Sequence, residues 1–206
     1  MIKITEFFKR RQGMSRVAFI EHWQTAHTHV VMGIENLRFY VQNPVLQTDS
    51  LPATWFDGMV EVWFDDVEAL RTNARSDYWP EVIADEKRFI DRDSLRVVMS
   101  ESDGHHLAES GYKLIALLEK PADCDVKEFQ TLVQKCLSTQ PNASGCDFPM
   151  SYWYEREANL LADALVSMRV KTYAELTAAI ESKAFDFLRD EFIVSAQFSV
   201  EERLIK

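Results

Sequence analysis

One order of secondary structure is predicted twice along this chain of 206 residues. Each half has the pattern strand, helix, strand, strand, helix, strand, inferred from β-prone runs, helix-capping residues and apolar periodicity. Predicted strands fall at residues 2–10, 37–43, 57–64 and 95–100, and again at 112–119, 150–155, 163–170 and 192–200. Predicted helices occupy 15–31, 65–70, 78–89 and 125–137, and the last begins at Thr172. We therefore expect two βαββαβ units in tandem, each a split-βαβ, ferredoxin-like module.

A module of this kind has a four-stranded antiparallel sheet with helices on one face, so its other face needs a partner. A second module in the same chain can supply that partner, with sheet against sheet in a closed barrel and the helices outside. We therefore expect an α+β fold, with modules at residues 1–103 and 111–206 joined by a polar linker at 104–110. His105 and His106 in this linker are interpreted as solvated, because no third metal ligand is near in sequence.

Composition excludes several function classes. The formal charge is −10, from 33 acidic and 23 basic residues, and the one dense basic run, at residues 9–11, is short. Such a surface repels phosphate backbones, so no nucleic-acid partner is expected. No apolar stretch reaches the roughly 18–20 residues of a membrane helix, and the first residues lack the apolar core of a signal peptide. We therefore expect no membrane partner and a cytoplasmic location. The three cysteines have no CxxC spacing, and we expect no disulfide, no metal and no cofactor.

The two halves differ in where their polar residues lie. The first predicted helices of the two halves can be aligned. In this alignment two histidines and a tryptophan take the places of aliphatic residues: His22, Trp23 and His27 align with Leu132, Val133 and Leu137. Glu61 in the third strand aligns with Ser167, and Asp85 lies in an insertion that the second half lacks. We therefore expect the functional site in the first half, with the second half as a scaffold.

His27 is the first candidate for acid/base chemistry. At about 100° per residue it lies in the middle of the apolar stripe of its helix, so its imidazole should point into the protein. His22 is five residues away, a spacing that does not place two side chains on one face of an α-helix. That spacing argues against a metal site. The alternative interpretation is that His27 is a core histidine with one satisfied hydrogen bond.

The candidate ligand-binding residues are two carboxylates, three aromatic residues and an amide: Glu61, Asp85, Trp23, Tyr40, Trp63 and Asn43. Glu61 alternates along its strand with Met59 and Trp63, and a carboxylate on a doubly covered sheet needs a partner or a raised pKa. A position at the rim of the sheet is the alternative for Glu61. A solvated helix surface is the alternative for Asp85, and a core position is the alternative for the aromatic residues.

Several motifs in this chain resemble, in the same order, the opening of EthD-domain proteins. They are KRRQGMS at 9–15, FIEHW at 19–23 followed by His27, LRFYVQN at 37–43, FDG at 56–58, EVWF at 61–64 and DEKRFID at 85–91. The resemblance covers about residues 1–100, and the second half is similar only in its pattern of elements. It implies the dimeric α+β barrel fold, also found in polyketide cyclases, muconolactone isomerases and antibiotic-biosynthesis monooxygenases. Here that barrel would form within one chain from tandem ferredoxin-like modules.

The resemblance also implies a histidine acid/base, because some EthD-like fungal proteins are implicated in dehydration of aromatic polyketide intermediates. We predict a cofactor-independent lyase or isomerase that dehydrates or cyclises an apolar cyclic or aromatic carbonyl compound. His27 would take a proton, with His22 as the second candidate, and Glu61 or Asp85 would orient the imidazole or protonate a leaving hydroxyl. Two alternatives remain: a non-catalytic small-molecule-binding or accessory protein of a catabolic pathway, and a cofactor-independent monooxygenase. A homodimer of the fused chain is also expected.

Overall fold

The computed structural model describes residues 1–102, 110–139, 145–150 and 161–206. The first half comprises β1 (Ile2–Arg10), α1 (Arg16–His22), the π-helical turn η1 (Trp23–His27), α2 (Thr28–Val31), β2 (Phe39–Leu46), β3 (Gly58–Phe64), α3 (Val67–Ala74), α4 (Trp79–Phe89) and β4 (Ile90–Glu101). The second half comprises β5 (Gly111–Glu119), α5 (Val126–Ser138), β6 (Gly145–Asp147), β7 (Ala164–Val170), α6 (Tyr173–Glu181), α7 (Asp186–Glu191) and β8 (Ile193–Leu204).

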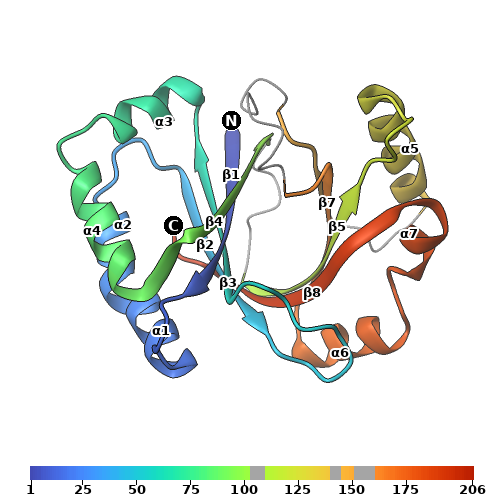
Figure 1. Ribbon diagram of the computed structural model, residues 1–206, viewed down its shortest axis with the longest axis horizontal. Helices are drawn as coiled ribbons and strands as arrows, with labels where there is room; N and C mark the ends of the chain where they lie inside the picture. Colours follow the sequence, from blue (N-terminus) through green and yellow to red (C-terminus); the bar gives the residue numbers. More distant parts are fainter. Residues whose placement is uncertain (103–109, 140–144, 151–160) are drawn as a thin grey trace.

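The strands form one eight-stranded sheet in the order β4-β1-β3-β2-β8-β5-β7-β6. Every ladder in it is antiparallel, including the β2–β8 ladder that joins the two halves. The two outer edges also meet, through a bridge between Ser100 and Pro149 and a 2.8 Å hydrogen bond from the Met150 amide to the Met99 carbonyl. Helices α1–α4 lie on one side of the strands and α5–α7 on the other (Figure 1). The expected α+β class with an antiparallel sheet is confirmed.

Short polar side chains start four of the described helices close to where the sequence predicts them. Ser15 caps α1 by accepting the Ala18 amide, and Asp66 caps α3 in the same way. Asp125 caps α5, and Thr172 forms a complete capping box with Glu175 at α6. These caps satisfy backbone amides that have no partner within the helix.

Three apolar clusters hold the fold together. One lies between the first four strands and α1–α4, and another between β5–β8 and α5–α7. The third joins strands of both halves, with Phe7 from β1, Met59 from β3, Ile115 from β5 and Phe198 from β8 among its buried members. Alternate residues of each strand therefore face either helices or the opposite half, as the period of two requires.

Two predicted segments lie mostly outside the described residues. The strand predicted at 150–155 lies outside the described residues except for Met150, and the described strand before β7 is the short β6. The expected linker at 104–110, with His105 and His106, also lies outside them except for Ser110.

Candidate functional site

The π-helical turn η1 brings His22 and His27 to the same side of their helix. Five α-helical residues turn through about 500°, which would leave two side chains about 140° apart. A π-helical turn is wider, with bonds from residue i to i+5, so it returns to the same face after five residues. The expectation that a spacing of five separates these histidines is therefore wrong, because the chain between them is not α-helical.

Asp85 of α4 contacts both imidazoles. Its Oδ2 lies 2.9 Å from Nδ1 of His27, and its Oδ1 lies 3.1 Å from Nε2 of His22. Asp85 is buried, so the alternative of a solvated surface position for it is wrong. The ring of Phe89 packs against both histidines, with centroid distances of 5.0 Å to His22 and 4.7 Å to His27. We call His22, His27 and Asp85 the histidine–aspartate cluster.

The chemistry of this cluster follows from its burial. Burial lowers the pKa of His27 below its ordinary value of 6.5, and the hydrogen bond and charge of Asp85 only partly oppose this. A carboxylate can only accept, so the His27 proton belongs on Nδ1 and Nε2 keeps its lone pair. A neutral imidazole in this tautomer can take a proton at Nε2. The His22 side chain is 21% exposed, so the cluster meets solvent on the His22 side.

Trp23 and Tyr40 lie in the core between the first strands and their helices. The Trp23 indole Nε1 donates a 3.0 Å hydrogen bond to the Tyr40 hydroxyl, and both side chains are fully buried. Gly58 makes room for the indole, because a Cβ at that position would lie 2.8 Å from the Trp23 ring. The structure thus places Trp23 within η1 and Tyr40 next to it on β2, both packed against other protein side chains.

Glu61 lies on the opposite face of the sheet, in a network to which all eight strands contribute. Lys3 and Lys113 bind its two carboxylate oxygens, Lys3 at 3.2 Å, and the Asn43 amide donates to it at 3.0 Å. Lys113 also contacts Glu202 at 2.7 Å. We call this set the eight-strand network; one residue comes from each of β1 to β8: Lys3, Asn43, Glu61, Ser100, Lys113, Asp147, Arg169 and Glu202.

The network settles the charge state of Glu61. Burial by itself would raise the pKa of Glu61, but the ammonium groups of Lys113 and Lys3 outweigh it and lower the pKa to about 2. For Lys3, burial acts to lower the pKa, and Asp147 and Glu61 more than compensate, so its pKa is raised. Glu61 is thus a carboxylate held in its charged form, and the alternative of a rim position is wrong because the side chain is buried.

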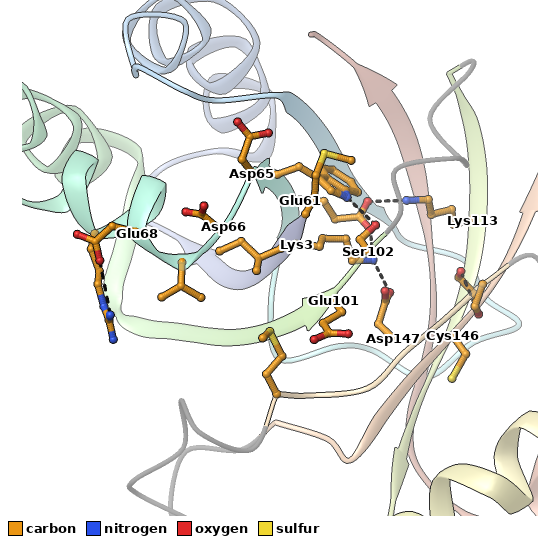
Figure 2. Close-up of a pocket in the computed structure, with 18 of the residues that line it drawn as sticks. Lys3, Glu61, Asp65, Asp66, Glu68, Glu101, Ser102, Lys113, Cys146 and Asp147 are labelled. Atoms are coloured by element: carbon orange, nitrogen blue, oxygen red, sulfur yellow. Dashed lines mark hydrogen bonds and ion pairs between the residues drawn. The ribbon is translucent and has the colours of Figure 1, made fainter.

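A cavity of about 990 Å³ opens above the eight-strand network (Figure 2). Glu61 and Trp63 line it from the first half, and Lys113 and Asp147 from the second. This cavity therefore does not belong to the first half alone, where the functional site is expected. The physical reason is that the cavity forms where strands of the two halves face each other.

The lysines of the network were missed by the sequence reasoning above. Lys3 and Lys113 each lie near the start of the first strand of their half, directly before an aliphatic residue, Ile4 or Leu114. A lysine repeated at equivalent places in the first strand of each half is the signal that could have identified them.

The described parts of the chain hold no group of three or more histidine, cysteine, aspartate or glutamate side chains suited to a metal ion. The three cysteines are free thiols. Among the described helices, none is long and apolar enough to cross a membrane.

Comparisons with known proteins find similar structures and one matching domain profile. No curated protein sequence matches the chain. A Fusobacterium nucleatum protein proposed to be a monooxygenase is similar over 100% of this chain and 92% of its own, at 11% identity and a TM-score of 0.56. A mutant chlorite dismutase from Candidatus Nitrospira defluvii is similar over 98% of this chain and 91% of its own, at 8% identity and a TM-score of 0.57.

Two further similarities cover half of the chain or less. An EthD family protein from Bacillus halodurans is similar over 50% of this chain and 98% of its own, at 22% identity and a TM-score of 0.43. Residues 11–93 match the sequence profile of the EthD domain, and this segment includes both histidines, Glu61 and Asp85. The chain carries an EthD domain in its first half.

Proposed function

We propose that the protein is a cofactor-independent lyase or isomerase that moves a proton on an apolar cyclic or aromatic carbonyl compound. His27 is the base, and Asp85 is the residue that positions it. The observation that carries this proposal is the 2.9 Å contact between the buried Asp85 carboxylate and His27 Nδ1, which directs the basic Nε2 away from Asp85. The EthD domain at residues 11–93 supports it, since the cluster lies within that segment.

The proposed reaction begins with proton removal from the carbon next to the carbonyl group. His27 Nε2 takes that proton, and the electron pair of the broken C–H bond moves to the carbonyl oxygen to form an enolate. In a dehydration, the enolate then expels a hydroxyl group from the neighbouring carbon, and the imidazolium returns its proton so that water leaves. His22 contacts the same carboxylate and is more exposed than His27, so it is the second candidate to donate that proton.

We further propose that the two halves are ferredoxin-like modules, at 1–103 and 111–206 with a linker at 104–110, that close a barrel within one chain. Each half follows the order βαββαβ, apart from the short helices that subdivide its helical segments. The β2–β8 ladder and the bridge between Ser100 and Pro149 support closure on both sides. A homodimer of the whole chain remains a prediction, and light scattering on the purified protein tests it.

The catalytic proposal can be tested without the natural substrate. The probe is 2-tetralone, an aryl-fused cyclic ketone, in D2O, with exchange of its α-protons followed by proton NMR. The wild-type protein should accelerate exchange, and His27→Leu should lose about 10²–10⁴-fold of that acceleration. The matched control is His29→Leu, since His29 is an exposed histidine two residues further along. Equal acceleration by wild type and His27→Leu would remove His27 as the base.

A second candidate function is non-catalytic binding of a small molecule in the cavity above the eight-strand network. The observation that favours it is the size of that cavity, about 990 Å³, with Trp63 on its wall. Native mass spectrometry of protein purified from its own host would detect a retained small molecule. Trp63→Ala should abolish retention, while Trp79→Ala, a half-buried tryptophan on α4 outside the cavity, should preserve it. Retention that survives Trp63→Ala would locate the ligand elsewhere.

A further inference from the structure

The turn between the two histidines has an unusual hydrogen-bonding requirement. A π-helical turn is rare and occurs mostly as a single turn inserted in an α-helix. In η1 the main-chain carbonyl of Trp23, its first residue, receives two side-chain hydrogen bonds. One comes from the Thr28 hydroxyl at 3.1 Å, and the other comes from the Gln42 amide at 2.8 Å. The carbonyl is therefore satisfied in part from outside its own helix.

Gln42 reaches this turn from β2. Its side chain is fully buried, and Nε2 lies 2.8 Å from the Trp23 carbonyl, 3.0 Å from the Thr28 hydroxyl and 3.0 Å from the Tyr40 hydroxyl. A carbonyl oxygen can only accept, so the nitrogen end of the Gln42 amide must face Trp23. The orientation of the amide is thus determined by its partner, and one amide group connects the sheet to both ends of the turn.

We infer that Gln42 is a positioning residue: it holds η1 in its π-helical form and thereby keeps His27 on Asp85. The consequence for catalysis rests on the proposed function, whereas the effect on the histidine geometry does not. If the turn relaxed to an α-helix, His22 and His27 would point about 140° apart and could not both contact one carboxylate. The buried amide thus determines which two side chains share Asp85, although it contacts none of the three groups of the cluster in any hydrogen bond described above.

The test uses the whole protein labelled with 15N-histidine, and its readout is the tautomer and pH titration of each imidazole. In the wild type, His27 should be protonated at Nδ1 and titrate below 6.5, since burial lowers its pKa. Gln42→Met keeps the length of the side chain and removes the N–H donor. It should move the His27 titration toward 6.5 and mix its tautomers, and it should lower the acceleration of 2-tetralone exchange at least tenfold.

Asn73→Leu is the matched control. Asn73 is another buried amide of the first half, and it donates to two main-chain carbonyls, Glu35 at 2.6 Å and Ala69 at 3.0 Å. Its loss should lower the melting temperature about as much as Gln42→Met while leaving the His27 titration unchanged. A merely structural role for Gln42 would make the two variants alike in every readout.

A second-site deletion tests whether the Gln42 amide acts on His27 through the turn. Deleting the exposed Ala26 in the Gln42→Met background removes one residue from the turn and places the histidines four apart, on one face of an ordinary α-helix. The wild-type tautomer of His27 should return. If Gln42→Met does not fold, Thr28→Val removes the hydroxyl that links Gln42 to the turn, and it should shift the His27 titration in the same direction.

The outcomes are distinguishable. A folded Gln42→Met, or Thr28→Val in its place, with unchanged His27 tautomer and titration would overturn the positioning role, whatever the activity. A shifted His27 titration in variants of a protein whose wild type does not accelerate exchange would support the positioning role and contradict the proposed reaction.

Discussion

Lys3 and Lys113 come from the first strand of each half, and each binds one oxygen of the buried Glu61 carboxylate. This arrangement crosses the boundary between the halves, so neither half contains it alone. Asp147 and Glu202 bind the remaining sides of the two lysines. Buried charges need such complete pairing, because removing one partner leaves an uncompensated charge in a poorly solvated place.

Removal of the Glu61 charge should therefore be strongly destabilising. We expect Glu61→Gln to lower the free energy of unfolding by about 3 kcal/mol or more, measured by urea denaturation at neutral pH. The control is Asp65→Asn, which breaks the exposed pair with Arg38 and should change stability by less than about 1 kcal/mol. Similar small effects of both substitutions would show that the lysines are satisfied without Glu61.

Because of the Glu61 carboxylate, we expect the stability of the fold to fall at acidic pH. The pKa of Glu61 is about 2 in the folded protein against an ordinary value of 4.5, so the unfolded chain binds this proton first as the pH falls. Its stabilising effect is complete above 4.5 and is lost as the pH falls towards 2. Unfolding curves at several pH values should show a shallower decline in Glu61→Gln than in the wild type over this window. Parallel declines would contradict the lowered pKa.

Because of His27, we also expect the stability of the fold to depend on pH at higher values. Because burial lowers its pKa below 6.5, the unfolded chain binds a proton more readily than the folded protein just below that value. The contribution of neutral His27 is fully present above 6.5 and falls as the pH decreases from there. His27→Leu should remove this part of the slope, measured as the difference in melting temperature between variant and wild type from pH 7.5 to 5. His29→Leu should leave the slope as it is.

From the position of Phe198 we expect the two halves to unfold together. It is buried in the cluster shared by both halves, with its ring centroid 4.8 Å from that of Phe56. Phe198→Ala should destabilise the protein by about 3–5 kcal/mol. Hydrogen exchange followed by mass spectrometry should then show faster exchange in peptides of β3 and of β5 alike. Continued protection of β3 while β5 exchanges would show that the halves unfold as separate units.

Local physical chemistry determined much of this protein from its sequence. The helix starts at Ser15, Asp66, Asp125 and Thr172 were predictable because a short polar side chain binds nearby backbone amides. The inward direction of His27 was predictable too, because burial of an apolar stripe sets the rotation of its helix. The repeated order of strands and helices led from the same local signals to the α+β class.

Only the tertiary structure determined which of these side chains contact each other. The sequence could not show that His22 joins His27 on Asp85, because the π-helical turn depends on an amide from β2, a strand that follows in the chain. Nor could it show that Lys113 completes the pairing of Glu61, because that contact exists only when strands of the two halves face each other. Helical spacing and strand alternation determine the side on which a residue lies, whereas the partner on that side depends on contacts between distant segments.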